Sequence, residues 1–230
     1  AKRPVHSYIA YFQAFTNTYA PVSYLEKIFT EAIQDPDVRA LSIATRPDCL
    51  GSDVLELLER LDRIKPVWVE LGLQTVHEET ARFIRRGYSL DVFDRAVADL
   101  RRLGITVIVH VILFLPGETE GRMLETVDYL NSRDIQGIKL QLLHVLEGTD
   151  LAGIYRDQPF HTPDMEEYIR VLGRCIVRLR PDIAIHRLTG DGPKDLLIAP
   201  LWTGAKRTVL NRLNQYLKEN DLWQGKEYYG

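Results

Sequence analysis

Cysteine is scarce in this chain, which has only Cys49 and Cys175 among its 230 residues. Two thiols exclude a disulfide-rich secreted scaffold and suit a reducing compartment, so we expect a cytoplasmic protein. They also exclude a cysteine-rich metal motif within the chain, because such a motif needs at least three converging ligands.

Long hydrophobic runs and a strong excess of one charge are also absent. No apolar stretch approaches the roughly 20 residues that span a bilayer, so no membrane partner is expected. The net charge is −3, and a chain so close to neutral has no overall field that would attract nucleic acid. The composition, 45% hydrophobic and 27% charged, is that of a globular protein.

Short β-branched runs alternate with longer segments of helical periodicity. The expected strands are residues 7–12, 40–44, 66–73, 105–115, 137–143 and 183–186. The expected helices are residues 21–34, 52–64, 78–103 with a break at Gly87, 120–131, 163–179 and 205–218. This alternation predicts βαβ units on a parallel sheet. A Gly-rich phosphate fingerprint is missing, which favours a barrel or partial barrel over a Rossmann sheet.

Three further segments have expected structures of their own. Residues 148–159 are expected to form a linker, and residues 224–230 a frayed tail. The aromatic side chains near the N-terminus are expected in the core, namely Tyr8, Tyr11, Phe12 and Phe15.

Polar side chains collect where the expected strands end. Thr45 and Arg46 follow the second strand, Glu70 and Gln74 lie on and after the third, and His110 lies within the fourth. Right-handed crossovers bring the carboxyl ends of parallel strands to one face, where α/β proteins build their sites. These residues therefore predict a ligand site.

The same residues have structural interpretations. A buried carboxylate is costly unless it is paired, so Glu70 is expected to contact a partner, with Arg46 or His110 as candidates for a structural ion pair. His110 lies in an apolar run, where a lone histidine is commonly a core residue whose ring nitrogens are hydrogen-bonded. Arg86 suits a helix end, where the macrodipole favours a cation.

Six motifs, in one order along the chain, resemble those of the radical S-adenosylmethionine superfamily. They are YIAYFQAFTNTYAP (8–21), TRPDCL (45–50), ELGLQT (70–75), LPGET (115–119), GIKLQLLHVLEGT (137–149) and HRLTGDGPKDLLIAPLW (186–202). The resemblance is closest to bacterial members related to the elongator catalytic subunit and to oxygen-independent coproporphyrinogen oxidases. It implies a partial (β/α) TIM-like barrel of parallel strands over residues 1–203, lacking the first strand, with a C-terminal helical extension over 204–230.

The resemblance also implies contacts with S-adenosylmethionine. Glu70 would lie near the ribose, Gln74 on the ribose hydroxyls and Arg86 on the methionine carboxylate, while the strand that contains Leu142 would supply backbone groups to the adenine. The full set of implied cofactor-binding residues is Thr45, Arg46, Glu70, Gln74, Arg86, His110 and Leu142. His110 stands where the oxidases have an aspartate, and Ala44 where they have a glutamate, so the chain departs from their pattern at two positions.

A larger departure concerns the [4Fe–4S] cluster, which the superfamily holds by three cysteines. This chain has no such triplet, so we expect it to be a fragment without the first strand and the cluster loop, inactive alone; a naturally cluster-less relative is the alternative. The resemblance implies that the full protein would cleave S-adenosylmethionine, using an external electron donor, to a 5′-deoxyadenosyl radical. The substrate and the oligomeric state are not predicted.

Two alternatives belong to other classes of function. Residues 178–218 lean basic, and relatives of the elongator type act on tRNA, so an RNA-binding module is one alternative; a solvated helical face is its structural counterpart. The other is a cluster-independent barrel enzyme with Glu70 and His110 as acid and base, which requires the two side chains within hydrogen-bond reach.

Overall fold

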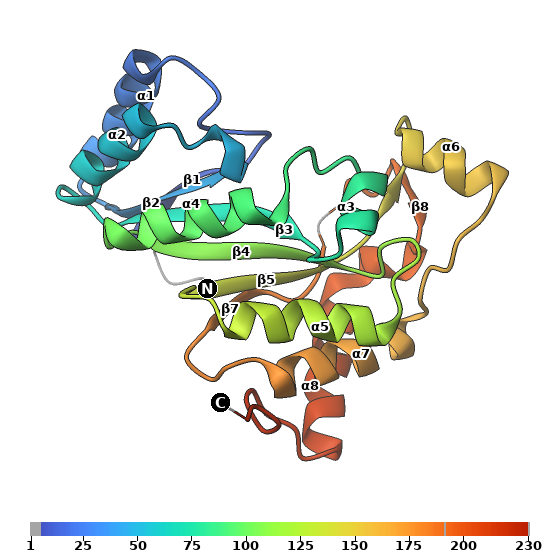
Figure 1. Ribbon diagram of the computed structural model, residues 1–230. Helices are drawn as coiled ribbons and strands as arrows, with labels where there is room; N and C mark the ends of the chain where they lie inside the picture. Colours follow the sequence, from blue (N-terminus) through green and yellow to red (C-terminus); the bar gives the residue numbers. More distant parts are fainter. Residues whose placement is uncertain (1–5, 191, 230) are drawn as a thin grey trace. The chain divides into compact units, whose positions relative to one another are not determined.

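The computed structural model describes residues 6–190 and 192–229 (Figure 1). These residues divide into two compact units. Residues 6–73, 88–110 and 134–137 form the first unit, and the remaining described residues form the second. Strand β4 (Thr106–Leu113) begins in the first unit and ends in the second.

The first unit is built on strands β1 (Tyr8–Phe12), β2 (Val38–Thr45) and β3 (Val67–Gln74), hydrogen-bonded in the order β1-β2-β3-β4. β1 pairs with β2, and β2 with β3, in parallel. Its helices are α1 (Val22–Gln34), the 3-10 helix η1 (Pro47–Cys49), α2 (Ser52–Asp62) and α4 (Leu90–Arg102).

Helical periodicity explains how these helices pack. Leu25, Phe29 and Ile33 recur every four residues along α1 and are all buried. Such an apolar stripe has to be covered by other side chains, and burial of each stabilises the fold by about 1.5–3 kcal/mol. The predicted alternation of strands and helices is therefore confirmed in this unit.

In the second unit the strand order is β4-β5-β7, with β5 at Gly137–Leu142 and β7 at Ala184–Arg187. Its helices are α3 (Glu78–Phe83), α5 (Glu120–Asn131), α6 (Asp150–Asp157), α7 (Met165–Arg178), the 3-10 helix η2 (Leu201–Ala205) and α8 (Lys206–Glu219). Helices α5 and α7 pack together, as do α7 and α8 (Figure 1). The buried face of α7 is centred on Tyr168, whose hydroxyl donates to the Leu188 carbonyl at 2.9 Å.

Three local expectations are wrong. The expected linker contains α6, capped by the Thr149 hydroxyl and packed through Ala152 against Leu151, Tyr155 and Phe160. It also adjoins a two-stranded antiparallel sheet, β6 (Val145–Leu146) with β8 (Leu197–Ala199). Elements this short show too little periodicity to be recognised.

None of the N-terminal aromatic side chains expected in the core is buried: Tyr8 is 52%, Tyr11 38% and Phe15 98% exposed, and Phe12 is half-buried. The expected tail is tethered rather than frayed over residues 224–229, and Gly230 lies outside the described residues. The Gln224 amide donates to the carbonyls of Arg180 and Ile183, and the Glu227 N–H donates to that of Val177. No described helix is both long and apolar enough to cross a membrane.

Candidate functional site

Glu70 is the centre of a buried polar cluster in the first unit. Its side chain is 4% exposed and accepts hydrogen bonds from Tyr11 Oη at 2.8 Å and Ser42 Oγ at 2.9 Å. His110 Nε2 lies 2.7 Å from Glu70 Oε2. An ionised carboxylate can only accept, so beside an ionised Glu70 the hydrogen of this bond is on Nε2. Four neighbouring strands therefore each contribute one member.

Sheet register explains how these side chains meet. Tyr11 pairs with Ser42, and Glu70 pairs with Ala44, two residues after Ser42. Side chains two residues apart on a strand point to the same face, so Tyr11, Ser42 and Glu70 share one face of the sheet. The expectation that Glu70 has a partner is confirmed, and His110 is such a partner.

Arg46, the other candidate partner, instead pairs with Asp48, with Nη2 2.6 Å from Oδ2. Its guanidinium also lies 5.2 Å from the centre of the Tyr88 ring. The hydrogen bond to Asp48 raises the pKa of Arg46 and lowers that of Asp48. Arg46 therefore serves the turn after β2 rather than the carboxylate of Glu70.

Thr45 is buried at the end of β2 and is tied to the segment that follows β1. Its hydroxyl lies 2.5 Å from that of Thr18, which also donates to the Cys49 carbonyl at 2.7 Å. The Asn17 amide donates to the carbonyls of Phe12 and Ala44. These bonds hold the two strand-ending segments against one another within the first unit.

Gln74 ends β3 with φ 66°, in the left-handed region, and belongs to the second unit. Its Oε1 is buried and has no hydrogen-bond partner among the described residues. An unpaired buried acceptor costs about 1–3 kcal/mol, so such a group calls for an explanation.

Arg86 lies in the same unit with a side chain that is 1% exposed. Nη1 donates to the Thr75 carbonyl at 2.7 Å, and Nη2 pairs with Glu78 Oε1 at 2.6 Å. The guanidinium thus holds the backbone directly after Gln74. The idea that Arg86 is a solvated helix-end cation does not describe so buried a group.

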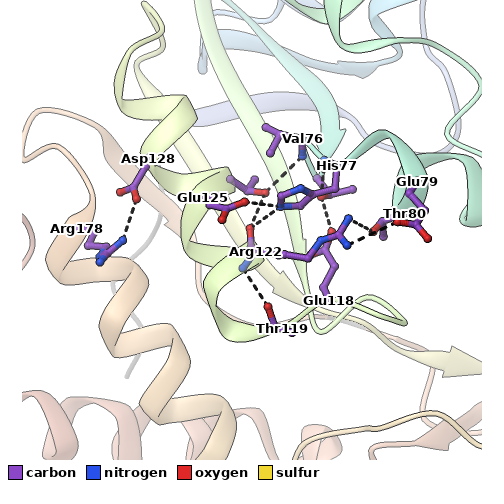
Figure 2. A network of polar contacts seen from close by, with 12 residues as sticks. Val76, His77, Glu79, Thr80, Glu118, Thr119, Arg122, Glu125, Asp128 and Arg178 are labelled. Carbon is purple, nitrogen blue, oxygen red and sulfur yellow. Dashed lines mark hydrogen bonds and ion pairs between the residues drawn. The ribbon is translucent and has the colours of Figure 1, made fainter.

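A network that sequence reasoning missed surrounds the segment after Gln74 (Figure 2). Glu118 accepts from the Thr75 hydroxyl at 2.5 Å, and burial raises the pKa of Glu118. His77 Nε2 lies 2.9 Å from the Arg122 carbonyl and 3.6 Å from Glu125. The signal for it was the LPGET motif, whose glutamate is Glu118.

Leu142 ends β5 and is buried. It lines a small cavity together with Tyr168, Thr189 and Trp202, among others. The rings of Tyr168 and Trp202 lie 5.5 Å apart between centroids. This is an apolar and aromatic setting, in which polar recognition falls to backbone groups.

The cysteines do not fit an iron–sulfur cluster. Cys175 is fully buried in α7, where burial raises the pKa of its thiol to about 12. Burial also raises the pKa of Cys49, and Asp48 adds to that effect. A cluster needs three or four thiolates, and the described residues contain no group of three or more metal-ligating side chains.

Comparison with known proteins identifies the family. Residues 2–130 match the Radical SAM superfamily, and residues 135–219 match the Radical SAM C-terminal domain. The uncharacterised protein YtqA of Bacillus subtilis is 42% identical over 219 residues, which cover 95% of this chain and 68% of that protein. Protein YhcC of Escherichia coli is 35% identical over 94% of this chain and 70% of its own length. A tRNA uridine(34) acetyltransferase of Methanocaldococcus jannaschii is 25% identical over 80% of this chain and 33% of its own.

A solved structure has the same fold. Elp3 of Methanocaldococcus infernus, with residues 1–46 deleted, superposes with a TM-score of 0.82 at 17% identity, covering 96% of this chain and 56% of that one. The α/β partial TIM-like barrel with a C-terminal helix is thereby confirmed. By the superfamily match over more than half of its residues and by its identity to YtqA, this chain belongs to the radical S-adenosylmethionine superfamily.

Proposed function

We propose that this chain is the S-adenosylmethionine-binding part of a radical S-adenosylmethionine enzyme. Superfamily membership supports the type of chemistry. The observation that carries the residue-level proposal is the buried Oε1 of Gln74, an acceptor without a partner among the described residues. A ribose offers hydroxyl donors, and one of them would satisfy this oxygen.

The second unit supplies three residues to this proposal. Gln74 accepts from a ribose hydroxyl, and the backbone around Leu142 meets the adenine edge. Arg86 was expected on the methionine carboxylate, but its guanidinium already bonds Thr75 and Glu78, so any carboxylate contact adds to those bonds. S-adenosylmethionine, when bound, supplies the radical chemistry, and these residues bind and orient it.

In the first unit, we propose that the cluster around Glu70 binds the cofactor together with Thr45 and Arg46. This part of the proposal depends only on the geometry within the first unit. Glu70 fixes the hydroxyl of Tyr11 and the imidazole of His110 by direct hydrogen bonds. Groups held in this way are pre-organised, which reduces the entropy cost of binding a polar ligand.

The cluster cysteines would come from residues outside these 230, because the chain has two cysteines in all. The edge strand β1 is compatible with this, since among the described strands it pairs with β2 alone. Tyr8 and Ile9 on that strand are exposed. An exposed apolar edge strand is a template for pairing with a further strand.

The alternatives receive less support. In the basic segment, Arg178 pairs with Asp128, Arg180 with Asp182 and Arg212 with Glu166, which offsets its charge. Glu70 and His110 do lie within hydrogen-bond reach, as an acid–base enzyme requires. Superfamily membership nevertheless favours the radical enzyme over both.

The proposal can be tested in the absence of an iron–sulfur cluster by measuring the binding of S-adenosylhomocysteine to the 230-residue chain with isothermal titration calorimetry. We expect saturable binding that Gln74→Leu weakens about tenfold, because one hydrogen bond to a buried acceptor is lost. Gln215→Leu, at an exposed glutamine of α8, is the matched control and should bind like the wild type. Absence of binding by the wild type, or equal loss in both variants, overturns the proposal.

A further inference from the structure

Every residue of the segment that follows Gln74 is held by a neighbouring element of the second unit. Thr75 is completely buried; its hydroxyl donates to Glu118 at 2.5 Å and its carbonyl accepts from Arg86 Nη1 at 2.7 Å. Thr75 Oγ1 also accepts the His77 N–H at 3.1 Å. A single hydroxyl therefore links Glu118 to the backbone two residues further on.

The other two residues are held by α5. The Val76 N–H donates to Thr126 Oγ1 at 3.4 Å. The His77 ring contacts the Arg122 carbonyl at 2.9 Å, and Figure 2 shows this ring between Arg122 and Glu125. The segment 75–77 is thus attached to α5 and to the loop before it at three successive positions.

This attachment matters because of the backbone of Gln74. A φ of 66° is unfavourable for a residue with a side chain, by about 1–2 kcal/mol. Such a conformation persists only where the surrounding structure over-determines it. The bonds to Thr75 are such a constraint, since they hold the hydroxyl and the carbonyl of the next residue.

We infer that Glu118 is a positioning residue for Gln74, acting through the Thr75 hydroxyl to hold the Gln74 amide in its ligand-accepting orientation. The inference rests on the proposed role of Gln74 in binding a nucleoside. Arg86 and Glu78 add a second constraint, since Arg86 donates to the Thr75 carbonyl and Glu78 pairs with the buried guanidinium.

The geometry predicts which substitutions preserve the hydrogen bond between the Thr75 hydroxyl and Glu118. Thr75→Ser keeps a hydroxyl and Glu118→Gln keeps an oxygen acceptor, so both should retain the link. Thr75→Val removes the hydroxyl at almost constant volume, and Glu118→Ala removes the acceptor. Glu79→Ala is the control, because the Glu79 side chain is 86% exposed and its carboxylate lies 3.8 Å from Arg122, beyond hydrogen-bond distance.

The first measurement is a double-mutant cycle on S-adenosylhomocysteine affinity. We expect Glu118→Ala to weaken binding about tenfold in the wild type and to have no further effect in Gln74→Leu, because coupled residues are not additive. Glu118→Gln and Thr75→Ser should stay within about twofold of the wild type, as should Glu79→Ala. Additive losses overturn the inference.

The second measurement, backbone hydrogen exchange, does not depend on ligand binding. The His77 amide should exchange about tenfold faster in Thr75→Val and Glu118→Ala than in Glu79→Ala. Thr75→Val removes the hydroxyl that accepts the His77 N–H, and Glu118→Ala leaves that hydroxyl free to rotate away. If the wild type binds no nucleoside, the proposed function fails, and hydrogen exchange alone decides the positioning claim. Unchanged exchange at residues 75–77 in both variants overturns that claim.

Discussion

His110 Nε2 lies 2.7 Å from Glu70 Oε2, and the same carboxylate oxygen accepts from Tyr11 Oη at 2.8 Å. Ser42 occupies the other oxygen. The three partners come from strands β1, β2 and β4, so one carboxylate on β3 joins side chains that are separated by 28 to 59 positions along the sequence. Glu70 is therefore both a candidate site residue and a structural link across the first unit.

The first prediction concerns this link. Glu70→Ala should lower the free energy of unfolding by about 3 kcal/mol, because removing one partner of a buried polar cluster leaves the others unsatisfied. Tyr11→Phe should cost about 1 kcal/mol, since it removes a single hydrogen bond. Urea unfolding measures both.

Glu26→Ala is the control, since Glu26 makes an exposed ion pair with Arg60. This substitution should lower the free energy of unfolding by less than about 1 kcal/mol. An effect of Glu70→Ala no larger than that of Glu26→Ala would show that the cluster does not stabilise the unit.

The second prediction concerns pH and Glu118. Burial raises the pKa of Glu118 in the folded protein, while the hydrogen bond from Thr75 and the charges of His77 and Arg122 partly oppose that rise. The folded state therefore binds the proton more tightly than the unfolded state, and Glu118 lowers stability as pH rises from the unfolded pKa through the folded one. Glu118→Gln removes this dependence.

The stability of Glu118→Gln minus that of the wild type should accordingly increase as the pH rises from the unfolded pKa of Glu118, about 4.5, through its raised folded pKa, and then level off. Urea unfolding at a series of pH values measures the difference. A difference that decreases over this range would mean that the Glu118 carboxylate is stabilised, not penalised, by its surroundings.

The third prediction concerns the thiols. With a pKa of about 12, Cys175 has about one part in ten thousand as thiolate at pH 8, and it is fully buried. Only Cys49 should react with Ellman's reagent in the native protein, and both should react in denaturant. Two fast native thiols would contradict the packing of α7.

The fourth prediction follows from the effect of Asp48 on its neighbour. Burial and the charge of Asp48 raise the pKa of Cys49, whereas Arg46 lowers it. Asp48→Asn should therefore lower that pKa and accelerate the reaction of Cys49 at a fixed pH. Asp53→Asn, on the following helix, serves as the control and should leave the rate unchanged.

The fifth prediction concerns Gly190, which lies against the ring of His144. A Cβ at Gly190 would come within 2.5 Å of His144 Cε1, so Gly190→Ala should displace the ring and destabilise the protein by about 1–3 kcal/mol. Gly153→Ala is the matched control: it lies in α6 with open space around the added atom, and should stabilise by about 0.5–1 kcal/mol. Equal melting temperatures of the two variants would contradict this difference.

Sequence reasoning recognised the long elements and the short strands β1 and β7, and it missed helix α6 and the strands β6 and β8. The helices α1, α2 and α7 and the strands β2 to β5 have enough residues for their periods to appear, and their bounds agree with expectation to within a few residues. Helix α6 and the β6–β8 pair are held by tertiary contacts and capping, which a periodic pattern does not report.

The sequence by itself determined the fold class, the family and the fact that a carboxylate on β3 needs a partner, because each follows from local pattern, motif order or the cost of burying a charge. Only the tertiary structure decided which partners are made. It joined Glu70 to His110, turned Arg46 to Asp48 and buried Arg86 against Thr75 and Glu78. The reason is physical: contacts between side chains distant in sequence depend on strand register and packing, and a one-residue shift in register would turn every side chain of a strand to the other face.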